Sequence, residues 1–183
     1  QDTIQNIGIP SLVLMERAAE CVARKAEQLC DQKTLQILAI CGVGNNGADG
    51  VAAARMLYLH GFDVLVVVVG NEAHATKEFE VQKGIAEKLE IPVVDWEHFL
   101  HGEDEQKAGD CAIIDAVFGV GLSRDVEGTY AAVLDWINKA ETEWVLAVDM
   151  PSGIHSDTGA VMGTAVKADV TVTFGYEKMG SAL

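Results

Sequence analysis

The sequence is poor in basic residues and has no long apolar run. It has 13 Lys and Arg residues against 28 Asp and Glu residues, so its formal net charge at pH 7 is −15. Non-specific nucleic-acid and anionic-membrane binding are excluded, because both need a positively charged face. A single phosphorylated small molecule is not excluded, since backbone amides can hold its phosphates. The longest apolar run, at 64–69, is far shorter than the roughly 20 residues that span a bilayer.

Cysteine and histidine are also too few and too scattered to form common metal or disulfide patterns. The 4 cysteines include no C-x-x-C pair, and the 5 histidines lack the spacing of metal ligands. We therefore expect buried thiols in a reducing compartment, the cytoplasm. We expect one domain spanning residues 1–183, which is enough chain for a sizeable core. Because it begins with Gln1 and stops soon after a glycine-containing turn, we expect it to be trimmed at both ends.

Glycine, in contrast, is plentiful, and its densest group follows the first predicted strand. The uniformly apolar segment 35–40 predicts a strand buried on both faces. The glycine-rich turn GVGNNGADG (42–50) follows, and a helix is predicted from 47 to 60. Further strands are predicted at 64–69, 92–94, 110–115, 144–148 and 169–174, with helices at 9–30, 76–89 and 129–140 and an acidic surface helix and loop at 95–109. This alternation predicts an α/β protein: a three-layer α/β/α Rossmann-like fold with a mostly parallel central sheet.

Three of the predicted loops carry unusual polar residues. Ligands of such sheets bind beyond the carboxyl ends of the strands, so the loops after 35–40, 110–115 and 144–148 should meet at one crevice. Asn46, Asp115 and Ser152 would then offer amide, carboxylate and hydroxyl oxygens, which hard cations prefer. One carboxylate among neutral oxygens suits a monovalent ion better than a divalent one. Asp149 is then available for acid–base chemistry.

The same residues allow other interpretations. GVGNNG (42–47) fits G-x-G-x-x-G between a strand and a helix, a weak dinucleotide fingerprint in which Glu72 could bind a ribose. A dehydrogenase-like site, a non-redox nucleotide site and purely structural roles, such as aspartates that cap helices, all remain open on spacing alone. A dehydrogenase would leave Asn45, Asn46 and Asp49 without a task.

Three motifs, in order, resemble the NAD(P)H-hydrate epimerase family: GVGNNGADG (42–50), DAVFGVGLSRDVEG (115–128) and AVDMPSGIHSDTG (147–159). The flanks IPSLVLMERAA and VTFGYEKMG are also similar, so the resemblance covers nearly the whole chain. It implies an isomerase of nicotinamide cofactor repair, which interconverts the R and S epimers of hydrated NADH and NADPH (NAD(P)HX). It further implies a bound potassium ion, frequent homodimers, and a functional partner, NAD(P)H-hydrate dehydratase, which can share the chain.

The resemblance also implies roles for single residues. Asp149 would contact the nicotinamide hydrate and serve as the acid–base residue, and the turn at 119–125 would hold the phosphates. The expected potassium ligands are Asn46, Asp115 and Ser152. The other expected substrate-binding residues are Asn45, Asn46, Gly47, Ala48, Asp49, Gly119, Val120, Gly121, Leu122, Ser123, Arg124 and Asp125.

Two positions depart from the family pattern. Ala48 stands where a second glycine is frequent, so a left-handed backbone there would be strained. Asp125 stands where proline is frequent and adds a negative charge that Arg124 can offset.

A nucleotide-binding or scaffolding domain without catalysis is the alternative function. The apolar start of the first helix, at 12–15, is expected in the core, with a dimer surface as the alternative.

Overall fold

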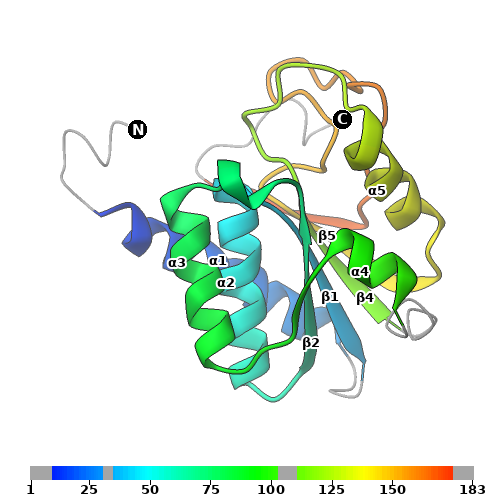
Figure 1. Ribbon diagram of the computed structural model, residues 1–183. Coiled ribbons are helices and arrows are strands. Elements are labelled where there is room, and N and C mark those ends of the chain that lie inside the picture. Colours follow the sequence, from blue (N-terminus) through cyan, green and yellow to red (C-terminus); the bar gives the residue numbers. More distant parts are fainter. Residues whose placement is uncertain (1–9, 31–34, 103–110, 175–183) are drawn as a thin grey trace.

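The computed structural model describes residues 10–30, 35–102 and 111–174, and it confirms the three-layer α/β/α architecture (Figure 1). The strands of the described chain form one sheet in the order β3-β2-β1-β4-β5-β6. Every neighbouring pair is parallel, so the sheet is more uniform than predicted. The strands are β1 (Gln36–Gly42), β2 (Asp63–Val69), β3 (Val93–Asp95), β4 (Cys111–Ala116), β5 (Thr142–Val148) and β6 (Val170–Val172).

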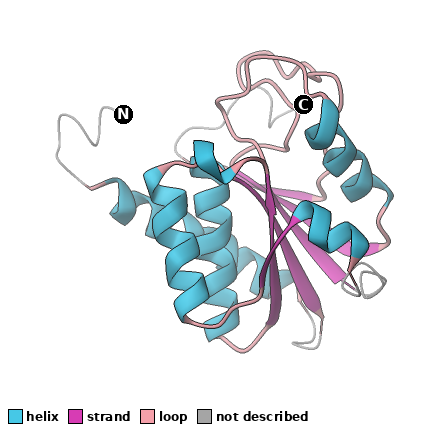
Figure 2. Cartoon of the chain, viewed as in Figure 1, coloured by secondary structure: helices cyan, strands magenta, loops and turns pink. Residues whose placement is uncertain are grey.

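Helices cover both faces of the sheet, which explains why its strands are apolar throughout. Helices α1, α2 and α3 lie on one face, and α4 and α5 lie on the other (Figures 1 and 2). Along β1, Ile37 and Ala39 pack in the core under the first group, whereas Leu38 and Ile40 pack in the core under the second. The helices are α1 (Ser11–Leu29), α2 (Asn45–Leu59), the 3₁₀ helix η2 (Glu72–His74), α3 (Lys77–Lys88), α4 (Trp96–His101) and α5 (Gly128–Lys139).

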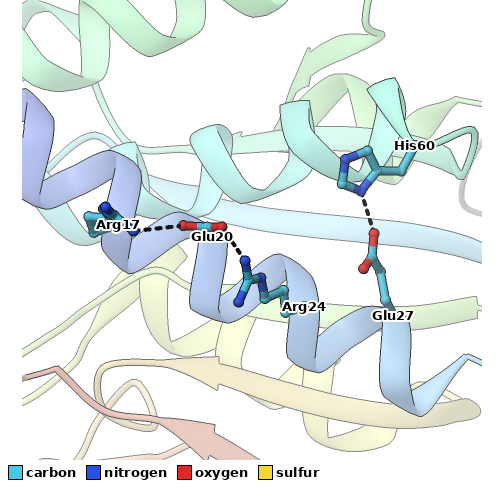
Figure 3. A network of polar contacts seen from close by, with 5 residues as sticks. All are labelled: Arg17, Glu20, Arg24, Glu27 and His60. Atoms are coloured by element: carbon cyan, nitrogen blue, oxygen red, sulfur yellow. Dashed lines mark hydrogen bonds and ion pairs between the residues drawn. The ribbon is translucent and has the colours of Figure 1, made fainter.

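Helix α1 packs against α2 through a polar surface as well as an apolar stripe. Glu27 of α1 contacts the ring of His60, which follows α2, and Glu20 pairs with two arginines of its own helix (Figure 3). Deeper in the same interface, Arg55 Nη2 lies 2.6 Å from Glu16 Oε1.

None of the described helices is long and apolar enough to cross a membrane.

Three local predictions were wrong. Leu12, Val13 and Leu14 are exposed rather than in the core, because Met15 alone of residues 12–15 lies on the buried stripe of α1. The segment 95–109 was expected at the surface, but α4 buries Trp96 and Phe99 against α5; the part beyond 102 lies outside the described residues. Cys21 is exposed, although Cys41 and Cys111 are buried as expected.

Candidate functional site

The glycine-rich turn is shorter than predicted, because α2 begins at Asn45 rather than at Gly47. The turn brings backbone against backbone. A Cβ built on Gly47 would lie only 1.6 Å from the Gly42 carbonyl oxygen, and one on Gly42 would lie 2.3 Å from the Val117 carbonyl oxygen. Ala48 fits without strain, since it lies in the first helical turn and its N–H donates to the Gly44 carbonyl at 3.0 Å. The substitution at 48 therefore requires no left-handed backbone.

The loops after β4 and β5 are tied together by a buried carboxylate. Ser152 Oγ donates to Asp115 Oδ1 at 2.6 Å, and Ser152 N donates to Asp115 Oδ2 at 2.8 Å. The hydroxyl of Ser152 in turn accepts from Phe118 N at 2.8 Å. Asp115 and Ser152 are both fully buried. We call this set of contacts the Asp115–Ser152 tie.

The third loop reaches the same place through Asn46. A Cβ built on Gly119 would lie 3.0 Å from Asn46 Oδ1, so the first helical turn of α2 faces the start of the 119–125 turn. The side-chain nitrogen of Asn46 is buried and has no hydrogen-bond partner among the described residues. The predicted meeting of three loops at one edge of the sheet is therefore confirmed.

Asp149 follows β5 directly and has a backbone conformation that is rare for a residue with a side chain. Its φ is 64°, in the left-handed region, and its N–H donates to the Val172 carbonyl at 2.8 Å. Its Oδ1 accepts from Phe174 N at 3.2 Å, and the residue is 9% exposed. Strained residues of this kind gather at functional sites. Nothing in the sequence signalled this conformation.

The carboxyl group of Asp49, on α2, is close enough to the Asp149 carboxylate for the two to interact electrostatically. Burial and then the Asp149 carboxylate raise the pKa of Asp49 from 3.8 to about 7. Burial also raises the pKa of Asp115 to about 6, although hydrogen bonds from Ser152 and Val117 act in the opposite direction. The site thus holds one carboxyl group, that of Asp49, which keeps a proton near neutral pH, and this suits acid–base chemistry.

We expect the protein to lose stability as the pH rises from 5 to 8 in potassium-free buffer. Folded Asp49 keeps a proton that the unfolded chain releases near pH 4, so folding binds a proton between about pH 4 and 7. This contribution is present below pH 4 and is lost as the pH rises through 7. We expect Tm to fall by about 5 °C over this range. Thermal denaturation followed by circular dichroism at each pH measures it.

In Asp49→Asn the same pH series should be flatter, with a remaining slope from Asp115. Glu143→Gln, which changes an exposed carboxylate on β5, is the matched control and should keep the wild-type slope. Equal slopes in the wild type and Asp49→Asn would show that Asp49 does not titrate in this range.

The 119–125 turn is open to solvent. Val120 is 49% exposed, and Gly121, Ser123, Arg124 and Asp125 are also exposed. The turn closes with a hydrogen bond from Leu122 N to the Gly119 carbonyl at 3.4 Å. It is accessible at the edge of the site, as an extended anionic ligand would require.

Glu72, the ribose ligand of the dehydrogenase interpretation, is engaged elsewhere. Its Oε2 lies 2.6 Å from Lys83 Nζ, and the two line a separate hollow of about 290 Å³ beside β3. Sequence reasoning missed two features of the site. One is the set of backbone N–H groups, of residues 117, 118 and 152, that donate to the side chains of Asp115 and Ser152. The other is a larger hollow of about 810 Å³ beside the glycine turn. Neither has a signal in side-chain spacing.

Comparison with known proteins finds a matching family model and relatives that agree with it. Residues 11–180 match the family model described as YjeF-related protein N-terminus. The chain is 49% identical over 180 residues to the NAD(P)H-hydrate epimerase of Limosilactobacillus fermentum, which covers 98% of this chain and 82% of the relative. It is 44% identical to the NAD(P)H-hydrate epimerase of Oenococcus oeni over 97% of this chain and 81% of the relative.

Two other relatives bear on fold and organisation. A Thermofilum pendens bifunctional NAD(P)H-hydrate repair enzyme is 39% identical over 100% of this chain, which corresponds to 35% of that enzyme. A yeast protein of known crystal structure matches with a TM-score of 0.87 over 99% of this chain and 78% of its own, at 22% identity. The second likeness shows the fold.

Proposed function

This chain belongs to the YjeF-related family, among the NAD(P)H-hydrate epimerases, and from this premise we propose how its site performs the epimerisation. The enzyme is an isomerase, and its substrates are the hydrated forms of NADH and NADPH. One observation carries the proposal: Asp149 is held in a left-handed conformation where the carboxyl-end loops of three neighbouring strands meet. Asp149 is the acid–base residue.

The reaction inverts C6 of the hydrated nicotinamide ring. The lone pair of the ring nitrogen forms a C=N bond as the C6–O bond breaks, and the departing hydroxyl takes a proton from Asp149. Water then adds to the other face of the ring and returns a proton to Asp149, so atoms and charges balance. Asp49, with a pKa of about 7, keeps a proton beside Asp149. The pair of carboxyl groups therefore holds a proton near neutral pH, and the first step requires that this proton lie on Asp149.

The donor chemistry at the Asp115–Ser152 tie fits a potassium ion. Asn46, Asp115 and Ser152 offer oxygen ligands with a single carboxylate, and the described residues include no group of three His, Cys, Asp or Glu side chains that could hold a metal. Within the part of the chain that the structure describes, the buried amide nitrogen of Asn46 has no partner, so its amide can turn its oxygen toward an ion. A potassium ion bound there would order the nicotinamide end of the site.

We expect Tm to be at least 2 °C higher in potassium chloride than in tetramethylammonium chloride of equal ionic strength, because a ligand that binds only the folded state stabilises it. Thermal denaturation in both salts measures the difference. Ser152→Ala should abolish it, whereas Ser156→Ala, in the same loop but outside the tie, should keep it. Equal Tm values of the wild type in both salts would contradict the potassium site.

The pyrophosphate is assigned to the 119–125 turn, with backbone N–H groups and Arg124 as donors. Support comes from the exposure of this turn and from the closeness of Gly119 to Asn46, a residue that we assign to the nicotinamide end. The glycines leave room for a phosphate to approach the backbone. Asp125 keeps the turn from being strongly positive, so hydrogen bonds rather than net charge hold the ligand.

The proposed biological setting follows from the same family. We propose a reducing, cytoplasmic location, supported by the buried thiols of Cys41 and Cys111. A NAD(P)H-hydrate dehydratase would act on the product, supported by the likeness to a bifunctional repair enzyme. We also propose a homodimer, supported by exposed Leu12 and Val13, which line a surface groove of about 510 Å³.

Epimer-resolved chromatography tests the function. Pure (6R)-NADHX or (6R)-NADPHX is incubated with and without the protein, and the approach to the mixture of epimers is followed. A large acceleration by the protein is expected. Spontaneous rates in the presence of folded protein would contradict catalysis and favour the non-catalytic scaffolding alternative.

A further inference from the structure

A hollow of about 810 Å³ opens beside the candidate site and has no role in the chemistry at Asp149. It lies at the carboxyl ends of β1, β2 and β3, where Val43, Gly70 and Asp95 follow or end adjacent strands. We call it the β2 hollow. Its volume lies within the range of small-molecule sites, roughly 300–1,000 Å³.

The β2 hollow borders the site, because two segments of the chain contribute residues to both. Val43 belongs to the glycine turn that precedes Asn45 and Asn46, and it lines the hollow. Arg124 belongs to the 119–125 turn and lines it from the other side. A ligand with its pyrophosphate on that turn can therefore extend one end toward Asp149 and the other end into the hollow.

One wall of the hollow is an aromatic ring held in a fixed position. Tyr130, on α5, packs against Phe118 in a tilted arrangement, with ring centroids 4.8 Å apart. A Cβ built on Gly70 would lie only 2.3 Å from the Tyr130 hydroxyl oxygen, so this ring position requires glycine at 70. Gly70 also has a φ of 114°, which side-chain-bearing residues avoid. The sequence of the β2 end is thus adapted to this wall.

The remaining lining includes the apolar side chains of Val68 and Trp96, the ring of His74, and a group of hydrogen-bond acceptors. Asp95 and Glu97 contribute carboxylates, and Asn71 and Thr129 contribute an amide and a hydroxyl. Arg124 supplies one positive charge against these two negative charges. Groups that donate hydrogen bonds, such as the hydroxyls of a ribose and the amino group of a purine, suit this set. A flat base suits the Tyr130 wall.

We propose that the β2 hollow binds the adenosine half of the dinucleotide, so that the substrate is held at both ends. The inference rests on the proposed function for its substrate. The adenine base packs against Tyr130, and the ribose hydroxyls donate to the acidic rim. Binding of this non-reacting half supplies energy that positions the hydrated nicotinamide at Asp149.

Photolabelling tests this site without relying on catalysis. Wild-type protein is irradiated with 8-azido-AMP, and the labelled peptides are identified by mass spectrometry. We expect label within 68–74, 95–97 or 124–130, and we expect excess AMP to prevent it. Label confined to other peptides, or no label that AMP prevents, would overturn the adenosine site whether or not the protein is an epimerase.

Kinetics with a full and a truncated substrate give the second test. Thr129→Trp places an indole in the hollow, and Ala132→Trp, on the same helix but outside the lining, is the matched control. We expect kcat/KM for (6R)-NADHX to fall at least 10-fold in Thr129→Trp only. For hydrated reduced nicotinamide mononucleotide, which lacks adenosine, we expect no change in either variant.

The outcomes separate the two proposals. Equal loss on both substrates in Thr129→Trp, or no loss on either, would contradict adenosine binding in the hollow. AMP should also inhibit wild-type turnover of the full substrate competitively, a measurement that needs no variant. If the wild type turned over neither substrate, the proposed function would fail, and the labelling result would still decide on the adenosine site.

Discussion

Asp149→Asn is expected to lower kcat for the epimerisation of (6R)-NADHX by at least about 100-fold, within the range of general acid–base contributions. The amide cannot give a proton to the departing hydroxyl or take one from water. Its geometry should otherwise persist, since asparagine tolerates the left-handed φ of 64° and its carbonyl oxygen can still accept from Phe174 N. The measurement is single-epimer chromatography over a time course.

The control for this variant is Asp157→Asn, which removes an exposed carboxylate in the loop that follows the same strand. It should retain wild-type kcat. Both variants should keep the wild-type far-ultraviolet circular dichroism, so that a loss of rate reports chemistry rather than unfolding. A kcat of Asp149→Asn within threefold of wild type would exclude Asp149 as the acid–base residue.

Gly47→Ala is expected to be the most destabilising single methyl addition in the glycine turn, at about 3 kcal/mol or more. The new Cβ would fall 1.6 Å from a carbonyl oxygen, and that oxygen belongs to the backbone of β1, which cannot rotate away. Either α2 moves off the sheet or β1 shifts its register. Both changes displace Asn46 from Gly119, so activity should also be lost. Urea denaturation gives the free energy of unfolding.

Gly84→Ala provides the same chemical change with the opposite expected sign. Gly84 lies inside α3, and a Cβ there meets nothing within 4 Å. Alanine should therefore stabilise the helix by about 0.5–1 kcal/mol through its higher helix propensity. If Gly47→Ala and Gly84→Ala changed the free energy of unfolding alike, the tight contact between α2 and the end of β1 would be refuted.

The sequence predicted the order of the elements because the apolar runs of this chain have strand length and are separated by helical patterns. It also predicted which loops would meet, because a parallel sheet places the carboxyl ends of all its strands at one edge. The edges of the predicted elements shifted by a few residues, and the short helix η2 was not predicted. Helix α2, for example, starts two residues early, which puts Asn45 and Asn46 in a helical turn.

The remaining features depend on three-dimensional packing that a linear pattern does not contain. The exposure of Leu12 and the burial of Trp96 were mispredicted. Each prediction followed the character of the neighbouring residues in sequence, apolar around Leu12 and acidic around Trp96, rather than the direction in which the side chain leaves its helix. The raised pKa of Asp49 needs both burial and a neighbour 100 positions away. Asp149, with its left-handed φ, is hydrogen-bonded to Val172 and Phe174, which come later in the chain.

The Asp115–Ser152 tie also has a consequence for the order in which the site is made during synthesis. A ribosome delivers Asp115 long before Ser152, which is separated from it by 37 positions. Until Ser152 emerges, the Asp115 carboxylate at the end of β4 lacks the two hydrogen bonds that the Ser152 N–H and hydroxyl donate in the folded protein. It must therefore remain hydrated. The growing chain can thus assemble β1, α2 and β2 early, but it stays inactive until its last third docks. Incomplete chains therefore present an open, solvated sheet edge and no competent site.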